Sequence, residues 1–443
     1  MKKTKLVWLP LVIGLLLVGC AKRYDKTLKV YSWQDYIDQT ILQDFEKYYK
    51  AKHGLSLKVE YVTFETNEEM GRVVEEEGAK YDLLCPSDYY IQRLIAKDLL
   101  IPFDFEGETH TIVENYDTYA SDYIKDLFSS QETPDKEGTL HSWVEYAVPY
   151  MWGTMGIAYN TSPKNANVKA EELTDWNTLW DSKYEHTFTM KNSVRDSYFI
   201  ALVNVYHQEL EDLAEQYENE EIDEVTYNTA VTAILNRTDS ASVTSVKDSL
   251  IALKRNSYGM EVDSGKNDIA DGNIDAYICW SGDAVYAAEL AAENNRTLSY
   301  VIPELGSNIW FDGWVMPKGS QTELAQEFVN YLNKPEIAAR NMNEVGYTTA
   351  VAGDAVLEQV IDWYSCEEDG NVEDLIPFDL SWFFEGTVEE EAETVIYVDE
   401  DTFGILKAQY PEYTDLARLT IMKDFADKNS SIIDMWSVVV STK

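Results

Sequence analysis

The chain has 443 residues, of which 45% are hydrophobic and 13% aromatic, so it is long enough for two folded domains with separate cores. Acidic residues outnumber basic ones by 79 to 36, and the formal net charge of −43 argues against nucleic acid or an anionic lipid surface as a partner. After Cys20 only three cysteines follow, without metal-ligand spacing, and no nucleophile elbow, Walker-type loop or dinucleotide fingerprint occurs. These absences leave catalysis, a metal and a cofactor with little support.

The amino-terminal segment is typical of a signal peptide. An apolar stretch over residues 6–18 follows three lysines and is too short for a good transmembrane helix. It ends in Leu17-Val18-Gly19-Cys20, where a small residue before a lone cysteine resembles a bacterial lipoprotein cleavage site. The resemblance implies removal of residues 1–19, palmitate or similar acyl chains on Cys20, and a polar tether over residues 20–27. The alternative is an ordinary secretory signal with an incidental cysteine.

Short apolar runs alternate with amphipathic segments in the first part of the mature chain. Strands are predicted at residues 28–32, 57–62 and 81–85, and helices at residues 37–49 and 67–77. This order predicts an open α/β sheet with parallel strands, in which ligands bind at the carboxyl ends of the strands. Those ends are the loops at residues 32–36 and 86–90, and both are rich in aromatic side chains.

The rest of the chain continues this mixture without a repeat or a low-complexity linker, so the domains are expected to interleave. A short helix is predicted at residues 176–180, a long helical region at 209–253, and further helices at 282–293, 325–332 and 413–425. Strands are predicted at residues 187–190 and 274–280, and apolar runs lie at residues 148–159, 301–303 and 309–316.

Aromatic and acidic residues gather just past predicted strands at residues 32–36, 86–90, 280–283 and 310–312. A primary alkylammonium group needs carboxylate acceptors for its charge and a flat apolar wall for its methylenes. Aromatic faces supply that wall and attract the cation, at roughly 0.5–2 kcal/mol each. The pattern therefore favours a linear polycation as ligand. For any single cluster, ordinary core or surface aromatics are the alternative.

Several motifs taken together resemble the bacterial spermidine/putrescine-binding proteins, the substrate-binding lipoproteins of polyamine ABC transporters. The resemblance runs from about residue 28 to about residue 347 and rests on Ser32-Trp33-Gln34-Asp35-Tyr36, Pro86-Ser87-Asp88-Tyr89-Tyr90, Pro149-Tyr150-Met151-Trp152-Gly153, Trp310-Phe311-Asp312 and Gly346-Tyr347. It implies an α/β, periplasmic-binding-protein-like fold of type II, with two sheet-and-helix lobes joined by hinge strands. We expect residues 28–147 plus 311–355 to form lobe 1 and residues 148–310 plus 356–443 to form lobe 2.

The resemblance also implies a set of ligand-binding residues. They are Trp33, Asp35, Tyr36, Ser87, Tyr89, Asp196, Trp280, Asp283, Trp310, Asp312 and Tyr347. Asp283 matches a position that is acidic in putrescine-preferring relatives, and Ser193 stands where spermidine-preferring relatives have an additional aspartate. Tyr89 and Trp310 follow the spermidine-preferring pattern, so either ligand stays open. The segment at residues 209–265 is longer and more acidic than the family pattern.

The function that the resemblance implies is capture of putrescine or spermidine outside the cytoplasm and delivery to an ABC permease and its ATPase. A monomer without cofactor, metal or catalytic residues is expected, held on the membrane by Cys20. The alternatives are the same fold with a different small cationic or polar solute, and a surface enzyme acting on amines or sugars, which would need a paired acid and base.

Overall fold

The computed structural model describes residues 24–76, 78, 80–103, 113–165, 168–169, 172–366, 374–389 and 392–442. The predicted signal peptide and Cys20 lie outside these residues. Residues 24–27 of the predicted tether are described, and β1 already begins at Lys26.

The first lobe, defined here as the half of the molecule around β1–β3, is an open parallel sheet. β1 pairs in parallel with both β2 and β3, as the predicted strand–helix alternation requires. Helix α1 begins after Asp38, whose side chain accepts from the Thr40 N–H, and it ends at Gly54 in the left-handed conformation. The elements are β1 (Lys26–Trp33), α1 (Gln39–His53), β2 (Leu57–Phe64), α2 (Asn67–Gly71), β3 (Leu83–Leu84), α3 (Asp88–Ala96), β4 (Leu100–Ile101), α4 (Glu114–Tyr119), α5 (Asp122–Ser129), β5 (Glu132–Pro134) and β6 (Leu140–Ser142).

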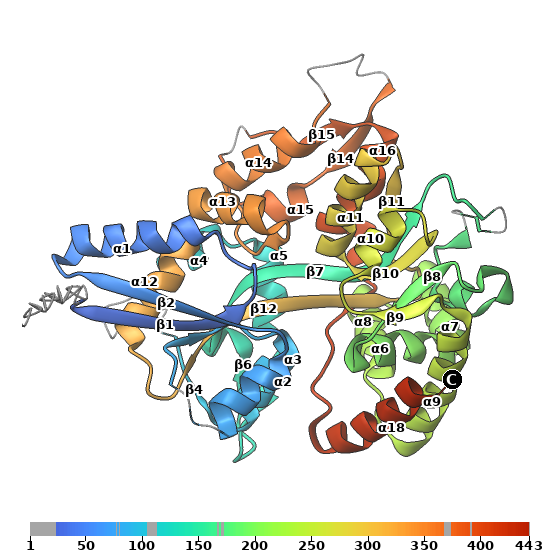
Figure 1. Cartoon of the computed structure of the whole chain (residues 1–443), viewed down its shortest axis with the longest axis horizontal. Coiled ribbons are helices and arrows are strands. Elements are labelled where there is room, and N and C mark those ends of the chain that lie inside the picture. Colours follow the sequence, from blue (N-terminus) through green and yellow to red (C-terminus); the bar gives the residue numbers. More distant parts are fainter. Residues whose placement is uncertain are drawn as a thin grey trace, which may run out of the picture.

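Two long strands, β7 (Ala147–Asn160) and β12 (Ser307–Pro317), run antiparallel through the middle of the molecule and join its two halves (Figure 1). In the main sheet the strand order is β2-β1-β3-β12-β7-β10-β8-β9. Both strands are almost completely buried. They are the strands through which the two halves of the sheet are joined.

The second lobe, defined here as the half around β8–β10, carries most of the helices that precede β12. Its elements are β8 (Phe188–Lys191), α6 (Val194–Val205), α7 (His207–Glu218), α8 (Glu224–Leu235), α9 (Ser240–Asn256), β9 (Gly259–Glu261), α10 (Gly265–Ala270), β10 (Ala276–Trp280), α11 (Ser281–Glu293) and β11 (Leu298–Val301). A separate core of this lobe lies around α6, α8 and α9.

The residues after β12 cover both lobes. Helix α16 packs on β11 and α11 of the second lobe, whereas α15 contacts α5 of the first (Figure 1). These elements are α12 (Thr322–Leu332), α13 (Pro335–Val345), β13 (Thr348–Thr349), α14 (Asp354–Tyr364), β14 (Ile376–Asp379), α15 (Ser381–Phe384), β15 (Val395–Val398), α16 (Glu400–Gln409), α17 (Tyr413–Leu416), β16 (Leu419–Thr420) and α18 (Asn429–Ser441). The lobe boundaries expected from the sequence stay predictions.

Three predicted helices differ in extent. The region at 209–253 is divided into α7, α8 and α9 because Asp223 and Asp239 cap new helices through their side chains. The helix predicted at 67–77 ends at Gly71 and continues as a π-helical turn over Arg72–Glu76. The helix predicted at 413–425 is wrong after Leu416, since Leu419–Thr420 instead forms β16 beside β12.

Candidate functional site

Asp312 lies at an irregularity in the middle of β12. The register between β12 and β7 shifts between Asp312 and Gly313, and such bulges re-aim a side chain. Backbone bridging to Ser87 and a hydrogen bond from the Gly313 N–H to the Pro86 carbonyl, at 3.0 Å, hold this turn of strand against the loop after β3. Residues 86–87 and the strand around Asp312 therefore meet; the loop predicted at 86–90 ends earlier than expected, because α3 begins at Asp88.

The Asp312 carboxylate is buried and only partly satisfied. Tyr36 Oη donates to its Oδ2 at 2.7 Å, whereas its Oδ1 is buried with no hydrogen-bond partner. Burial raises the pKa of Asp312 to about 6, whereas the nearby hydroxyl groups of Ser87 and Tyr36 act to lower it. A buried carboxylate oxygen without a donor is the position at which an ammonium group would be accommodated.

Aromatic rings surround this carboxylate. The ring of Tyr347 lies 5.9 Å from that of Tyr36 and 5.5 Å from that of Trp310, centroid to centroid, in edge-to-face arrangements. Tyr36 is fixed from behind, because Tyr150 Oη donates to its carbonyl at 2.7 Å. We call Tyr36, Asp283, Trp310, Asp312 and Tyr347 the aromatic–acid cluster.

Asp283 belongs to the cluster from the second lobe. It is in the first turn of α11, and its Oδ1 accepts from Tyr347 Oη at 3.2 Å. Its Oδ2 accepts from Tyr277 Oη and from Lys191 Nζ, both at 3.2 Å. The structure thus links Asp283 through Tyr347 and Tyr36 to Asp312.

Asp196 and Trp280 lie beside this second-lobe end of the cluster. Asp196 is in the first turn of α6 and is buried, which raises its pKa; hydrogen bonds from Ser193 and Trp280 and the charge of Lys191 act in the opposite direction. Both predicted residues are therefore close to Lys191, whose ammonium lies 4.3 Å from the Trp280 ring centroid.

The remaining predicted residues lie in the first lobe. Trp33 packs its ring on Phe64 at 4.5 Å, and Tyr89 Oη donates to Glu68 at 3.1 Å. Ser87 accepts from the Asn67 side chain at 3.1 Å. Asp35 is not brought to the cluster: its side chain is exposed and accepts from Gln34, and its φ of 51° places it in a tight left-handed turn.

Sequence reasoning missed two charged residues. Asp88, at the start of α3, accepts from the Phe311 N–H at 3.2 Å, and burial raises its pKa to about 7. Lys191 ends β8 with its side chain fully buried. Asp88 stood in a quoted motif without a role, and Lys191 lies in an apolar run that signals only a strand.

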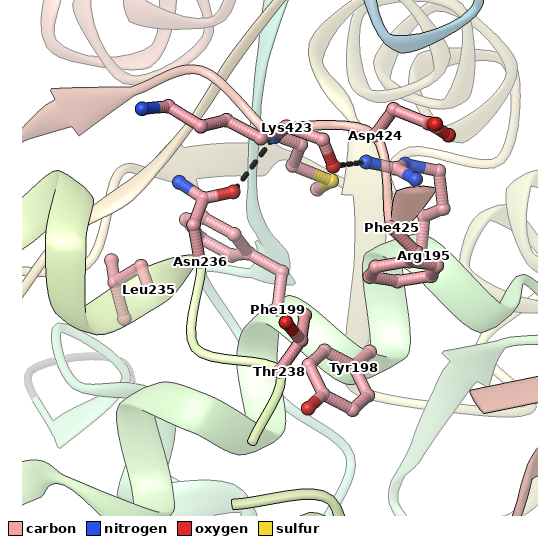
Figure 2. A pocket seen from close by; sticks show the side chains of 10 residues that line it. Arg195, Tyr198, Phe199, Leu235, Asn236, Thr238, Lys423, Asp424 and Phe425 are labelled. Atoms are coloured by element: carbon pink, nitrogen blue, oxygen red, sulfur yellow. Dashed lines mark hydrogen bonds between the residues drawn. The ribbon is translucent and has the colours of Figure 1, made fainter. Parts of the chain in front are cut away.

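A cavity of about 160 Å³ lies between α6 and the segment after β16. Figure 2 shows Arg195 donating to the Lys423 carbonyl, and the Lys423 N–H donating to Asn236 at 2.7 Å. The Arg195 guanidinium also stacks on Tyr89 at 4.1 Å. None of the predicted ligand-binding residues lines this cavity.

Within the residues that the structure describes, no cluster of three histidine, cysteine, aspartate or glutamate side chains could hold a metal ion. In the same part of the chain, no helix combines the length and the apolar character needed to span a membrane.

Comparison with known proteins places this architecture. A model of the family described as bacterial extracellular solute-binding protein matches residues 41–363. The chain belongs to this family. The putrescine-binding periplasmic protein SpuD of Pseudomonas aeruginosa is 29% identical over 350 residues, covering 76% of this chain and 82% of SpuD. The putrescine-binding periplasmic protein PotF of Escherichia coli is 27% identical, covering 77% and 84%.

The structural comparison agrees. A putative spermidine/putrescine ABC transporter structure from Listeria monocytogenes superposes with a TM-score of 0.61 at 25% identity, covering 94% of this chain and 99% of that one. The expected two-lobed fold of type II and the resemblance to polyamine-binding relatives are therefore confirmed. Members of this family are described as extracellular solute-binding proteins.

Proposed function

We propose that this protein captures a polyamine, putrescine or spermidine, between its lobes outside the cytoplasm and delivers it to an ABC importer. The relatives support the ligand class, because SpuD and PotF are putrescine-binding periplasmic proteins by name. The observation that carries the proposal is the buried Asp312 carboxylate with its unpartnered Oδ1 beside Tyr36, Trp310 and Tyr347.

The chemistry of this arrangement fits an ammonium group. The Asp312 oxygen would accept a charge-assisted hydrogen bond, and the aromatic rings would pack on the methylenes and attract the charge. Excluding water from the site would strengthen each of these contacts. A neutral sugar would leave the buried carboxylates uncompensated, and a carboxylate ligand would be repelled by them.

Capture requires the two lobes to separate and close. Asp312 and Asp283 are both more than nine-tenths buried, so a ligand reaches them only when the lobes open. We propose that β7 and β12 bend as the hinge, between lobes bounded as the sequence predicts at 147/148, 310/311 and 355/356. Closure would bring Asp196 and Asp283 toward a ligand held on Asp312, with Trp33, Ser87, Tyr89 and Trp280 at its sides.

The proposed setting is the outer face of a membrane. Lipid on Cys20 would hold the protein there as a monomer, and the closed lobes would present a surface to a permease driven by a cytoplasmic ATPase. The proposed role is capture without turnover. Conversion of any amine by the purified protein would contradict it.

Calorimetric titration tests the proposal. A chain beginning at Ala21 keeps every described helix and strand, because the first of them starts at Lys26. After unfolding and refolding to remove endogenous ligand, it should bind putrescine, cadaverine, spermidine or spermine tightly at one site. A folded protein that binds none of the four would overturn the polyamine assignment and leave the fold intact.

A further inference from the structure

The second-lobe end of the aromatic–acid cluster already contains an ammonium group of the protein itself. The Lys191 side chain is 0% exposed. Its Nζ donates to the Val262 carbonyl at 3.0 Å, to Tyr277 Oη at 3.2 Å and to Asp283 Oδ2 at 3.2 Å. Each of the three protons of this ammonium therefore has an acceptor.

The surroundings of this ammonium match those that a polyamine end would need. Lys191 Nζ lies 4.3 Å from the Trp280 ring centroid and 5.0 Å from that of Tyr277. The Glu261 carboxylate is 3.3 Å away. Because the lysine end is itself a primary alkylammonium, Lys191 fills a complete amine site with the protein's own atoms.

Each oxygen of the Asp283 carboxylate lies near a lysine ammonium. Besides Lys191 on its Oδ2, Lys266 Nζ lies 3.5 Å from its Oδ1. Asp312 and Asp196 differ: among the described residues, no lysine, arginine or histidine nitrogen lies within 4.0 Å of either carboxylate. Both carboxylates are buried without a close ion pair; within the same described residues Asp312 has no cation acting on it, whereas the charges of Lys191 and Arg195 act on Asp196 from beyond 4.0 Å.

We propose, as a refinement that rests on the proposed function, that Lys191 sets the ligand preference toward diamines. Asp312 and Asp196 bind the two ammonium groups of a diamine. A third ammonium group of a longer polyamine would need a carboxylate partner of its own, and it meets the Lys191 ammonium instead. Two like charges that lie close together in a buried site repel each other strongly, and this repulsion opposes binding. Lys191 acts here as a specificity-determining residue.

The unmodified protein gives the first test, by calorimetry with putrescine, cadaverine, spermidine and spermine. We expect putrescine or cadaverine to bind at least tenfold more tightly than spermidine. A tenfold preference for spermidine would overturn the role of Lys191 while confirming polyamine capture. No binding of any of them would overturn the proposed function itself.

Variants give the second test. Lys191→Met alone leaves Glu261 and Asp283 with less compensation, so the main variant is the double change Lys191→Met with Glu261→Gln, which keeps the net charge and frees Asp283. The glutamine can still accept from the Gly265 N–H, as Glu261 does at 3.0 Å. The matched control is Lys254→Met, which removes a lysine ammonium that binds the Val439, Val440 and Thr442 carbonyls.

The double variant should improve spermidine affinity relative to putrescine at least tenfold, whereas the control keeps the ratio of the unmodified protein. Circular dichroism and the melting temperature verify folding. An unchanged ratio in a folded double variant that still binds a polyamine would overturn the role of Lys191 without affecting the proposed function.

Discussion

At the scale of single residues, two opposing effects act on the charge of the Asp312 carboxylate. Burial disfavours its charge, whereas the ammonium ligand proposed above would require it. Its hydrogen bond from Tyr36 and its place beside Ser87 keep the carboxylate oriented before any ligand arrives. A preoriented carboxylate loses little freedom on binding, which favours affinity.

Replacing Asp312 by asparagine should be the most damaging single change in the cluster. The variant keeps the shape but loses a charge-assisted hydrogen bond, at about 1.5–3 kcal/mol, so affinity should fall about tenfold to 150-fold. Calorimetric titration with the tightest-binding polyamine measures it. The control is Asp35→Asn, which removes the same charge from an exposed position and should leave affinity within twofold. Equal losses in the two variants would contradict the cluster as the site.

Polyamine affinity should depend on pH through Asp312. As pH falls through about 6, this carboxylate takes up a proton and loses its attraction for a cation, so affinity should fall below pH 6 and level off above pH 7. Titrations between pH 5 and 8 measure this. A flat profile would show that the Asp312 charge does not contribute.

The stability of the ligand-free protein should show the opposite trend. The pKa of Asp312 is raised to about 6 and that of Asp88 to about 7, both by burial, so the folded state holds these protons more tightly than the unfolded state. Their contribution to stability is complete below pH 4 and is lost as pH rises through 6 to 7. Between pH 4 and 7, the melting temperature of each single variant, Asp312→Asn or Asp88→Asn, should fall less than that of the unmodified protein.

The motifs that carry the family resemblance supplied the residues that meet around Asp312, since local patterns alone do not bring together residues as distant as Tyr36, Asp283 and Tyr347. They did not predict Lys191, since a lysine in a strand carries no signal for the carboxylates that fold against it from β9 and α11. They misplaced Asp35, because its left-handed backbone turns the side chain outward. The linear sequence pattern does not show which distant segments of the chain come into contact.

At the scale of elements, helix α11 controls the cluster through its first turn. A Cβ on Gly282 would lie 2.4 Å from two carbons of the Tyr347 ring, so the absence of a side chain there lets the ring lie over the helix start. The same turn supplies Asp283, whose Oδ1 accepts a hydrogen bond from Tyr347 Oη.

Gly282→Ala should therefore displace the Tyr347 ring and weaken polyamine binding at least fivefold in a protein that still folds. Calorimetry and circular dichroism measure the two effects. The control is Gly259→Ala in β9, where a Cβ meets nothing within 4 Å. Unchanged affinity in Gly282→Ala would mean that Tyr347 does not contact the ligand.

Element prediction succeeded where periodicity and caps agree locally, as in α1 with its capping Asp38 and closing Gly54. It failed at residues 417–425, where Leu419 and Ile421 are buried beside β12 instead of on a helix face. The extended conformation of this segment depends on its pairing with β12, which lies about a hundred residues earlier in the chain.

At the scale of the whole molecule, residues 417–425 bind both lobes. On one side Asn228 donates to the Leu419 carbonyl at 2.8 Å; on the other, Gln92 of α3 donates to the Met422 carbonyl at 3.0 Å. Arg93 of α3 pairs with Asp424 at 2.7 Å. These contacts connect the two lobes through one segment.

Asp424→Asn should open the lobes more readily and speed polyamine dissociation about fivefold, as expected for a partly exposed ion pair contributing about 1 kcal/mol. Stopped-flow measurement of the dissociation rate checks this. Asp98→Asn, which breaks the exposed pair with Lys318, is the control and should leave the rate unchanged. Equal dissociation rates in the two variants would show that the contact of residues 417–425 with α3 does not help to hold the lobes together.

The position of β12 in the sheet has a consequence for how the chain folds. β12 lies between β3 and β7, so these two strands keep open hydrogen-bonding edges until residues 307–317 are available. A chain interrupted before Ser307 would expose both edges and would aggregate through them. Assembly of even the amino-terminal lobe must therefore wait for a segment that emerges late in synthesis.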